Sequence, residues 1–201
     1  LMETSLLGAV PLVWVPASDV PQPYQQLLVH DHDMTSELAS FYGESIALTV
    51  LQAKHTGNDY LREVVLHTSA TRTPVEYGLI KINLDSFPVE LRPRILAGET
   101  PLGAILNASG LSYRSEPQGF FTIPAARLET IFPQSATGKI LYGRYNHLIC
   151  GEITILARIL EILPTSQLLD LPLITSHPIP CPTTTQSSSA AAPPAPPPPH
   201  C

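Results

Sequence analysis

Apolar and polar residues alternate along much of the chain with a period that predicts strands. Six runs show this pattern, at residues 45–54, 60–68, 75–84, 111–123, 139–149 and 153–163. The last two are separated by a tight turn at Cys150, Gly151 and Glu152. Strands joined by short links favour antiparallel pairing, so the pattern predicts an α+β domain built on an antiparallel sheet.

Helical signals fall between these runs. Four stretches carry them, at residues 22–30, 34–41, 88–96 and 101–108. Asp33 is expected to be the N-cap of the second helix, and Thr100 that of the fourth, with Pro101 in its first turn. The apolar run at 6–15 is interpreted as a first strand or covering segment, because a signal peptide would need a basic start.

Composition changes sharply near Pro164. Residues 165–201 contain a single charged side chain, and the segment 178–199 alone holds nine of the 22 prolines. Such a sequence has little to bury and favours polyproline II conformation. We therefore expect a folded domain over residues 1–164 and a disordered tail over residues 165–201.

Charge and cysteine content narrow the class of protein. The formal net charge is −6 and the isoelectric point about 5.6, which argues against a nucleic-acid partner. No apolar run is long enough to span a bilayer, so no membrane partner is expected. Three cysteines make no disulfide framework, and the expected location is therefore the reducing cytoplasm.

Most short motifs are absent or weak. Neither a glycine-rich phosphate loop nor a GxSxG nucleophile elbow occurs. The string His30-Asp31-His32-Asp33 resembles a metal site, but a polar loop that ends in a helix N-cap is the favoured interpretation, so no metal or cofactor is expected. His67, His147 and Cys150 are interpreted as structural residues.

Arg62 and the start of the fourth helix form the strongest candidate for a binding site. Arg62 lies inside the apolar run YLREVVL, and the N–H groups near Leu102 open a helix after Pro101. A guanidinium and free helix N–H groups both bind carboxylates. The same pattern is equally compatible with an Arg62 that faces the surface and pairs elsewhere.

The chain resembles the chorismate lyase family. The resemblance covers about residues 20–164 and is carried by ordered stretches: LLVHDHDMTSEL, SIALTVLQ, YLREVVL, TPLGAIL, YGR and LICGEITILARILEILP. It implies a six-stranded antiparallel sheet with helices on one side and a ligand buried beneath two helical flaps. By resemblance, Arg62 grips the ligand carboxylate, the Leu102 N–H binds the same group, and Met34 lines the pocket.

The sequence departs from the family at one acidic position on the last strand. Counting from Gly151, Arg158 stands near the place of the family's glutamate, and Glu161 follows three residues later. Either Arg158 replaces the acid as a catalytic residue beside Arg62, or a displaced Glu161 supplies it as a substrate-binding group. Replacement by Arg158 is favoured, because no glycine marks a bulge in the strand.

The resemblance implies a function as well as a fold. It implies a cofactor-independent lyase that eliminates pyruvate from chorismate to give 4-hydroxybenzoate. Two alternatives stay open: a diverged enzyme that eliminates, rearranges or cyclises an anionic secondary metabolite, and a non-catalytic small-molecule binding module, the latter least favoured as a regulator. All three imply a small carboxylate ligand, and the protein is expected to be a monomer or weak oligomer.

Overall fold

The computed structural model describes residues 7–8, 11–133 and 139–165. These residues belong to the first of two units of the chain, Leu1–Leu171; the second is Pro172–Cys201. Apart from Thr165, the expected tail at 165–201 lies outside the described residues and stays a prediction.

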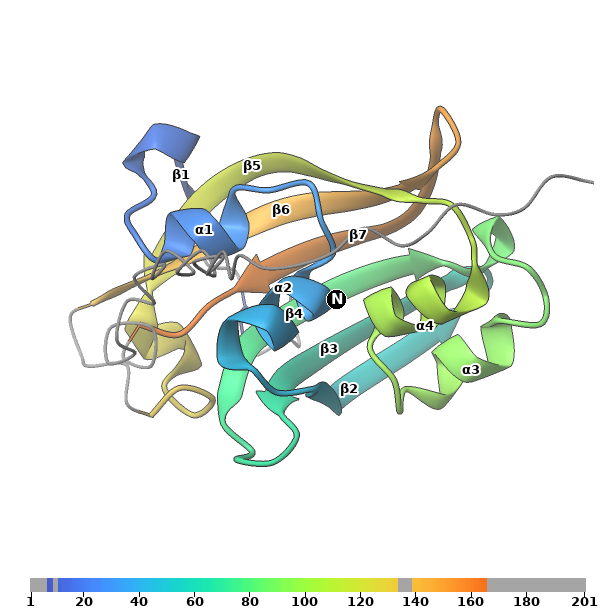
Figure 1. The fold of residues 1–201 in the computed structure, drawn as a ribbon, viewed down its shortest axis with the longest axis horizontal. Coiled ribbons are helices and arrows are strands. Elements are labelled where there is room, and N and C mark those ends of the chain that lie inside the picture. Colours follow the sequence, from blue (N-terminus) through green and yellow to red (C-terminus); the bar gives the residue numbers. More distant parts are fainter. Residues whose placement is uncertain (1–6, 9–10, 134–138, 166–201) are drawn as a thin grey trace, which may run out of the picture. The chain divides into compact units, whose positions relative to one another are not determined.

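A seven-stranded sheet forms the body of the described chain, and every neighbouring pair is antiparallel. The strands are β1 (Val13–Val15), β2 (Ile46–Thr56), β3 (Asp59–Thr68), β4 (Pro74–Asn83), β5 (Arg114–Pro124), β6 (Ile140–Cys150) and β7 (Thr154–Ile162). Their order across the sheet is β1-β5-β6-β7-β4-β3-β2 (Figure 1). The α+β antiparallel architecture is confirmed. The expected count of six strands is wrong, because β1 pairs with the edge of β5 as a short seventh strand.

The four α-helices of the described residues lie in front of the sheet in the view of Figure 1. They are α1 (Tyr24–Leu28), α2 (Met34–Tyr42), α3 (Arg92–Ala97) and α4 (Leu102–Ser109), and short 3₁₀ turns occur at Ala17–Asp19, Leu84–Ser86 and Ala125–Leu128. Asp33 is confirmed as the N-cap of α2, since its Oδ1 accepts a hydrogen bond of 2.9 Å from the N–H of Ser36. In α4 the N-cap is Pro101 instead of Thr100, and no side chain caps the helix.

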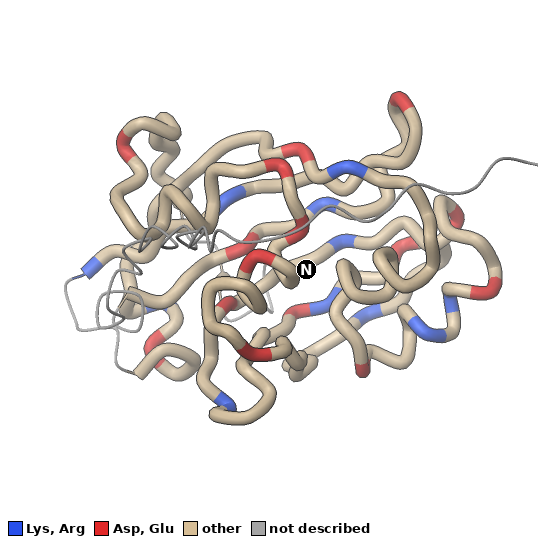
Figure 2. The backbone as a smooth tube through the Cα atoms, in the orientation of Figure 1, with Lys and Arg blue, Asp and Glu red and all other residues tan. Residues whose placement is uncertain are grey.

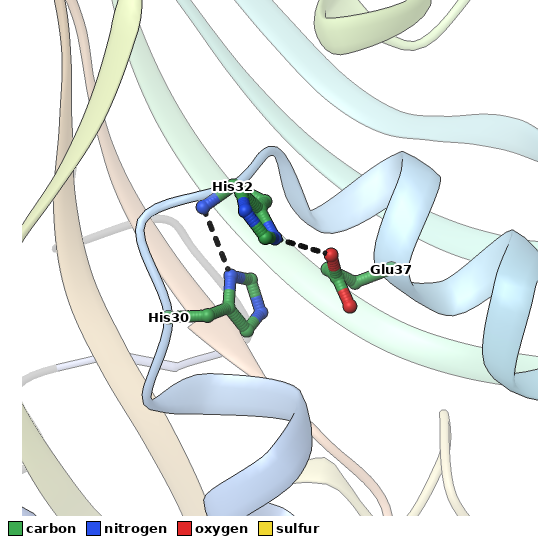
Figure 3. Close-up of side chains that lie close together, drawn as sticks. All are labelled: His30, His32 and Glu37. Atoms are coloured by element: carbon green, nitrogen blue, oxygen red, sulfur yellow. Dashed lines mark hydrogen bonds and ion pairs between the residues drawn. The ribbon is translucent and has the colours of Figure 1, made fainter.

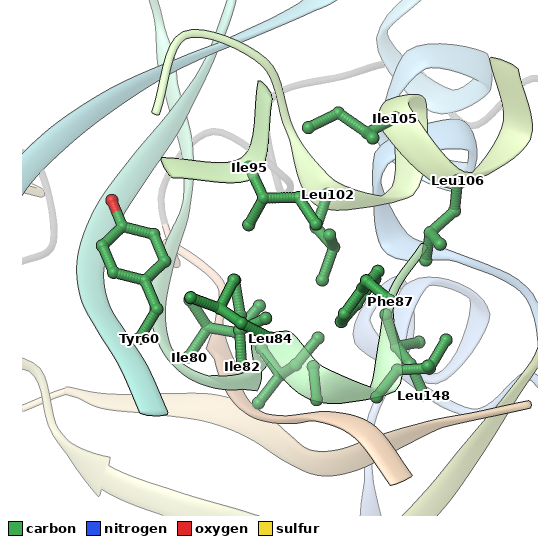
Figure 4. Packing of buried hydrophobic residues seen from close by; sticks show 13 residues of the cluster. Tyr60, Ile80, Ile82, Leu84, Phe87, Ile95, Leu102, Ile105, Leu106 and Leu148 are labelled. Carbon is green, nitrogen blue, oxygen red and sulfur yellow. The ribbon is translucent and has the colours of Figure 1, made fainter. Parts of the chain in front are cut away.

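An apolar cluster joins α4 to the sheet. Ile105 and Leu106 of α4 are fully buried and pack on the face that carries Ile80 and Ile82 of β4 (Figure 4). Spacing of three to four residues places the apolar side chains of α4 on one face of the helix, which explains why it lies flat on the sheet. Each such side chain contributes about 1.5–3 kcal/mol by leaving water.

The opposite face of the sheet is also covered. Leu128 and Phe132, after β5, are buried in one cluster with Tyr77 of β4 and Phe121 of β5. Because both faces of the central strands carry apolar clusters, polar residues on either face can be buried. Glu63 is one of these: Gln52 and Tyr77 donate hydrogen bonds to its carboxylate.

Gly143 of β6 offers a test of this close packing. A Cβ at this position would lie 2.6 Å from the Glu161 carbonyl oxygen and 2.7 Å from the Phe121 ring. We expect Gly143→Ala to lower the free energy of unfolding by about 1–3 kcal/mol, because backbone on one side and a buried ring on the other must shift. Urea denaturation checks this, and a loss below about 0.5 kcal/mol, the level of an ordinary surface substitution, would contradict the close approach of β6 and β7.

Candidate functional site

A cavity lies between the sheet and the first turns of α2 and α4. Its empty volume is about 540 Å³, including the solvent at its mouth. Apolar side chains of the sheet, among them Val64, Ile80 and Leu148, form much of its wall. Six polar side chains also line it: Asp33, Thr35, Arg62, Glu76, Asn146 and Glu161. An apolar pocket with a few convergent polar groups is typical of a small-molecule site.

Arg62 reaches the cavity from β3 and is only 2% exposed. Its Nε and Nη1 atoms have no hydrogen-bond partner among the residues that the structure describes. Burial lowers the pKa of its guanidinium, and the neighbouring Tyr60 hydroxyl opposes this effect. An arginine stays charged under these conditions, so Arg62 is a buried cation with donors left over for an anion.

The first turn of α4 faces the same cavity. Leu102 and Gly103 line it, and the absence of a side-chain cap leaves the N–H groups of this turn free of a side-chain acceptor. The positive end of the helix dipole adds to their attraction for an anion. Gly103 is needed for the approach, since a Cβ here would lie 2.7 Å from Oδ1 of Asp33 at the start of α2.

Glu161 of β7 is neutralised inside the protein. The Nε of Arg144, on β6, donates to its carboxylate, and both side chains are buried. Arg144 also donates to the carbonyl oxygens of Leu28 and His30, at 3.3 and 3.1 Å. The ion pair therefore ties two strands to the segment that leads into α2.

Glu76 of β4 has no such partner. It is 3% exposed, and its Oε2 has no hydrogen bond among the described residues. Burial raises the pKa of its carboxyl well above the ordinary range; the nearby Glu161 carboxylate raises it further, and Arg144 opposes this. Glu76 thus keeps its proton to a higher pH than an exposed glutamate does.

The histidines of the expected metal-like string contact Glu37 and Arg144. His32 lies 2.7 Å from the Glu37 carboxylate, and the N–H of His32 donates to Nδ1 of His30 (Figure 3). Together His30, His32 and Glu37 bring three ligand-type atoms within 4.8 Å of one another. However, Nδ1 of His30 also accepts from the Arg144 guanidinium, and its Nε2 donates to Leu27. The lone pair of His30 is therefore engaged next to a fixed positive charge, which disfavours a cation and suits a structural connection.

The structure brings four of the five expected site residues together. Arg62, Met34, Leu102 and Glu161 all line the cavity. Arg158 does not: it is exposed, and its strand neighbours in register are Lys81 and His147.

The expectation that Arg158 replaces the acidic group in the pocket is therefore corrected. The pairing of β6 with β7 shifts between Leu148 and Ile149, so one extra residue is accommodated in β7 near Leu156. This irregularity occurs without a glycine, and both Leu156 and Ala157 are buried in the apolar cluster under α4. Beyond it, alternation turns Ile159 and Glu161 toward the cavity and Arg158 away from it.

Sequence analysis missed two charged residues of the site, Glu76 and Arg144. Glu76 stands in the apolar run VEYGLIKIN, which is the same signal that drew attention to Arg62. Arg144 belongs to the stretch YGR that carries the family resemblance, and it is fully buried in its ion pair with Glu161. In each case a charged residue inside a run predicted as a strand was the feature that could have indicated a buried, functional side chain.

The fold and cavity define the class of this protein: an α+β domain with a cavity under the helices that cover one face of an antiparallel sheet. No family model matches the chain, and no curated protein sequence matches it. Among solved structures, PhnF from Mycobacterium smegmatis is similar, with a TM-score of 0.50 and 14% identity over 68% of this chain. The chain spans 65% of the length of that PhnF chain.

Two further structures cover separate domains. The effector domain of PhnF matches with a TM-score of 0.51 and 14% identity, over 66% of this chain and 88% of that domain. A protein from Bordetella bronchiseptica, described as the ligand-binding domain of a GntR-family transcriptional regulator, matches at a TM-score of 0.43 and 12% identity. That match covers 60% of this chain and 83% of the other.

These comparisons contradict the expected identity as a chorismate lyase. The two PhnF structures carry the fold, one of them as an effector domain, and neither is described as a lyase. The expectation that the protein eliminates pyruvate from chorismate is therefore wrong. The expected product, 4-hydroxybenzoate, and the expected place in biosynthesis are wrong for the same reason. Among the helices that the structure describes, none has the length and apolar character to cross a membrane.

The Arg144–Glu161 pair predicts a large loss of stability when it is broken. We expect Arg144→Met to lower the free energy of unfolding by about 3–5 kcal/mol, because Glu161 is left buried without its cation. Urea denaturation measures the loss. The double variant Arg144→Met/Glu161→Gln should recover part of it, since no lone charge remains. A loss for the single variant below about 1 kcal/mol would contradict a buried, uncompensated Glu161.

Glu76 predicts a pH-dependent stability. Its folded-state pKa lies above the unfolded-state value, so its proton stabilises the fold fully below pH about 4.5 and less as pH rises toward the folded-state pKa. Glu76→Gln does not titrate, so we expect the variant to gain stability relative to the natural protein as pH rises from about 4 to 8. Denaturant unfolding of both proteins across this range checks the sign, and a difference independent of pH would contradict it.

Proposed function

We propose that this chain is a non-catalytic effector-type domain that binds a small anionic ligand in the cavity under α2 and α4. One observation carries the proposal: Arg62 is 2% exposed, lines the cavity, and has two donor atoms without partners among the described residues. The similarity of the fold to the effector domain of PhnF supports the same class of function.

The energetics of Arg62 favour a binding role over a purely structural one. An unpaired buried cation destabilises a fold, and replacing it with an apolar side chain is often neutral or stabilising. A carboxylate that accepted a hydrogen bond from a free N–H of Arg62 and met the first turn of α4 would compensate that charge. The stability that the empty protein loses by burying an unpaired Arg62 is thus regained when the ligand binds.

The other charged groups support binding without turnover. Glu161 is held in an ion pair with Arg144, and Arg62 is not a base at neutral pH. Glu76 is buried and keeps its proton to raised pH, so it serves better as a hydrogen-bonding group than as a base poised near neutrality. A ligand held by these residues is recognised and released unchanged.

Arg62→Met tests the proposal through two readouts of opposite sign. We expect the variant, without ligand, to be at least as stable as the natural protein, because a lone buried charge is gone. We also expect it to lose the stabilisation by small carboxylates or inorganic phosphate that the natural protein shows, which reaches about 2.7 kcal/mol at a hundredfold excess over Kd. Thermal denaturation with a panel of these anions measures both.

The exposed Arg158 provides the matched control. Arg158→Met removes the same charge outside the cavity, so it should leave anion stabilisation intact. If no anion stabilises the natural protein, or if Arg62→Met responds to anions as the natural protein does, the proposed function is overturned. Recovery of the bound ligand unchanged, checked by mass spectrometry, separates binding from turnover.

A further inference from the structure

The cavity contains a second buried group without a partner, and its charge type is opposite to that of Arg62. Glu76 is 3% exposed, lines the cavity, and leaves Oε2 without a hydrogen bond among the described residues. Arg62 and Glu76 form no ion pair with each other in the structure. At contact distance Arg62 would stabilise the Glu76 carboxylate, but the fold holds the two groups apart.

The strand register explains this separation. On the paired strands β3 and β4, Arg62 stands opposite Ile80, and Glu76 stands opposite Leu66. The two charged residues are therefore four positions apart along the strands, or about 13 Å at about 3.3 Å per residue. Val64 and Gly78 are opposite each other between them and line the floor of the cavity.

Gly78 lies between Val64 and the carboxyl group of Glu76. A Cβ at position 78 would lie 3.0 Å from Val64 and 3.3 Å from Oε1 of Glu76, so the missing side chain lets both groups lie close to the backbone of β4. The Glu76 carboxyl group therefore extends along β4 toward the Arg62 end, which shortens the distance that a ligand has to bridge.

We propose that the cavity binds a small ω-amino carboxylate, whose carboxylate pairs with Arg62 and whose ammonium group, several bonds away, pairs with Glu76. This inference rests on the proposed anion site at Arg62 and adds the chemical class of the ligand. A ligand with only a carboxylate would leave the Oε2 of Glu76 unsatisfied, at the cost of a buried polar group.

The charges around Glu76 favour an ammonium group over a hydroxyl. Glu161 on β7 is close enough to act on it, and Arg144 on β6 offsets only part of that negative field. Asp33, before α2, lies at the other end of the cavity beside Gly103 of α4, and Ser36 and Asn107 donate to its carboxylate. Among the described residues that line the cavity, Arg62 on β3 is the only cation. A ligand cation at Glu76 would compensate the acidic field that Glu161 adds there, and a neutral group would not.

Binding of such a ligand has a proton balance that can be measured. In the empty cavity Glu76 keeps its proton to raised pH. An ammonium group that pairs with it favours the carboxylate, so the O–H bond of Glu76 breaks and the proton leaves to solvent. The affinity for an amino carboxylate should accordingly rise with pH until Glu76 is ionised in the free protein, whereas that for a plain carboxylate should not rise.

The experiment compares ligands that differ only in the terminal group. The full chain is titrated in a calorimeter with 3-aminopropanoate, 4-aminobutanoate, 5-aminopentanoate and 6-aminohexanoate. Each is paired with the alkanoate that has a methyl group in place of the ammonium, such as hexanoate for 5-aminopentanoate. We expect one amino acid of this series to bind at least about tenfold more tightly than its alkanoate. It should also release a proton that the alkanoate does not, measured in two buffers of different ionisation enthalpy.

Two glutamine variants assign the effect to Glu76. Glu76→Gln should lose the preference for the amino ligand and still bind the alkanoate, whereas Glu129→Gln, at an exposed site, should keep the preference. Circular dichroism and thermal unfolding check that the variants are folded. The proton release of the natural protein tests the same claim without any variant.

The outcomes separate this inference from the proposed function. Equal affinity for amino acids and alkanoates, with no difference in proton release, overturns the amino carboxylate inference and leaves the anion site intact. Equal affinity of the best-binding amino acid and the hydroxy acid of the same length overturns it too, because the Glu76 end would then select no charge. If neither alkanoates nor amino acids bind at any length, and the other anions do not bind either, the proposed function fails as well.

Discussion

The buried ion pair between Arg144 and Glu161 is the interaction on which the site depends. It joins β6 to β7 in the centre of the sheet, and the same guanidinium holds the carbonyl oxygens that precede α2. Without it, the connection that leads to Met34 at the cavity would lose its main tie to the strands. Arg144 donates to Glu161 and to these carbonyl oxygens and not to Glu76, so Glu76 faces the cavity with a raised pKa.

Register then determines which charges stay unpaired. An antiparallel pair of strands brings side chains into contact only when they are opposite or diagonal neighbours. Arg144 meets Glu161 because they are opposite in β6 and β7. Arg62 and Glu76 lie on adjacent strands of the same sheet, yet four positions separate them. The same geometry thus neutralises one pair of charges and holds another pair apart.

Much of the fold could be predicted from sequence, because the strands and caps depend on local patterns. Alternation located six strands to within a few residues, and Asp33 was recognisable as an N-cap from its place before a helical run. Val13–Val15 belongs to the run at residues 6–15, which was interpreted as a first strand or covering segment and was not counted among the six strands of the sheet. The irregularity near Leu156 had no signal, since it depends on how β6 and β7 pair and not on a glycine.

A residue of the site could be predicted from sequence only where it is unusual among its immediate neighbours. Arg62 is conspicuous as a cation inside an apolar strand, and its burial follows once both faces of the sheet are covered. The other charged groups of the site depend on contacts between distant parts of the chain. The irregular pairing of β6 with β7 decides whether Arg158 or Glu161 faces the cavity. The charge of Glu76 depends on Arg144, which is 68 positions away in the sequence. The family resemblance predicted the α+β fold, but the function that it implied was wrong. The fold determines where a cavity forms, whereas the charged groups inside the cavity determine what it binds.

The two uncompensated groups also explain how a cavity of this kind can respond to its ligand. Each buried group without a partner lowers the stability of the empty domain, and each regains a partner when a complementary ligand binds. The surrounding apolar clusters, with α4 packed on β4 by fully buried side chains, provide the stability that tolerates this cost. Because α2 and α4 both contribute first-turn residues to the cavity, a ligand that satisfies Arg62 and Glu76 would also hold these two helices against the sheet. Ligand occupancy would then be expressed as order in the helices that cover the site, as the proposed effector-type function requires.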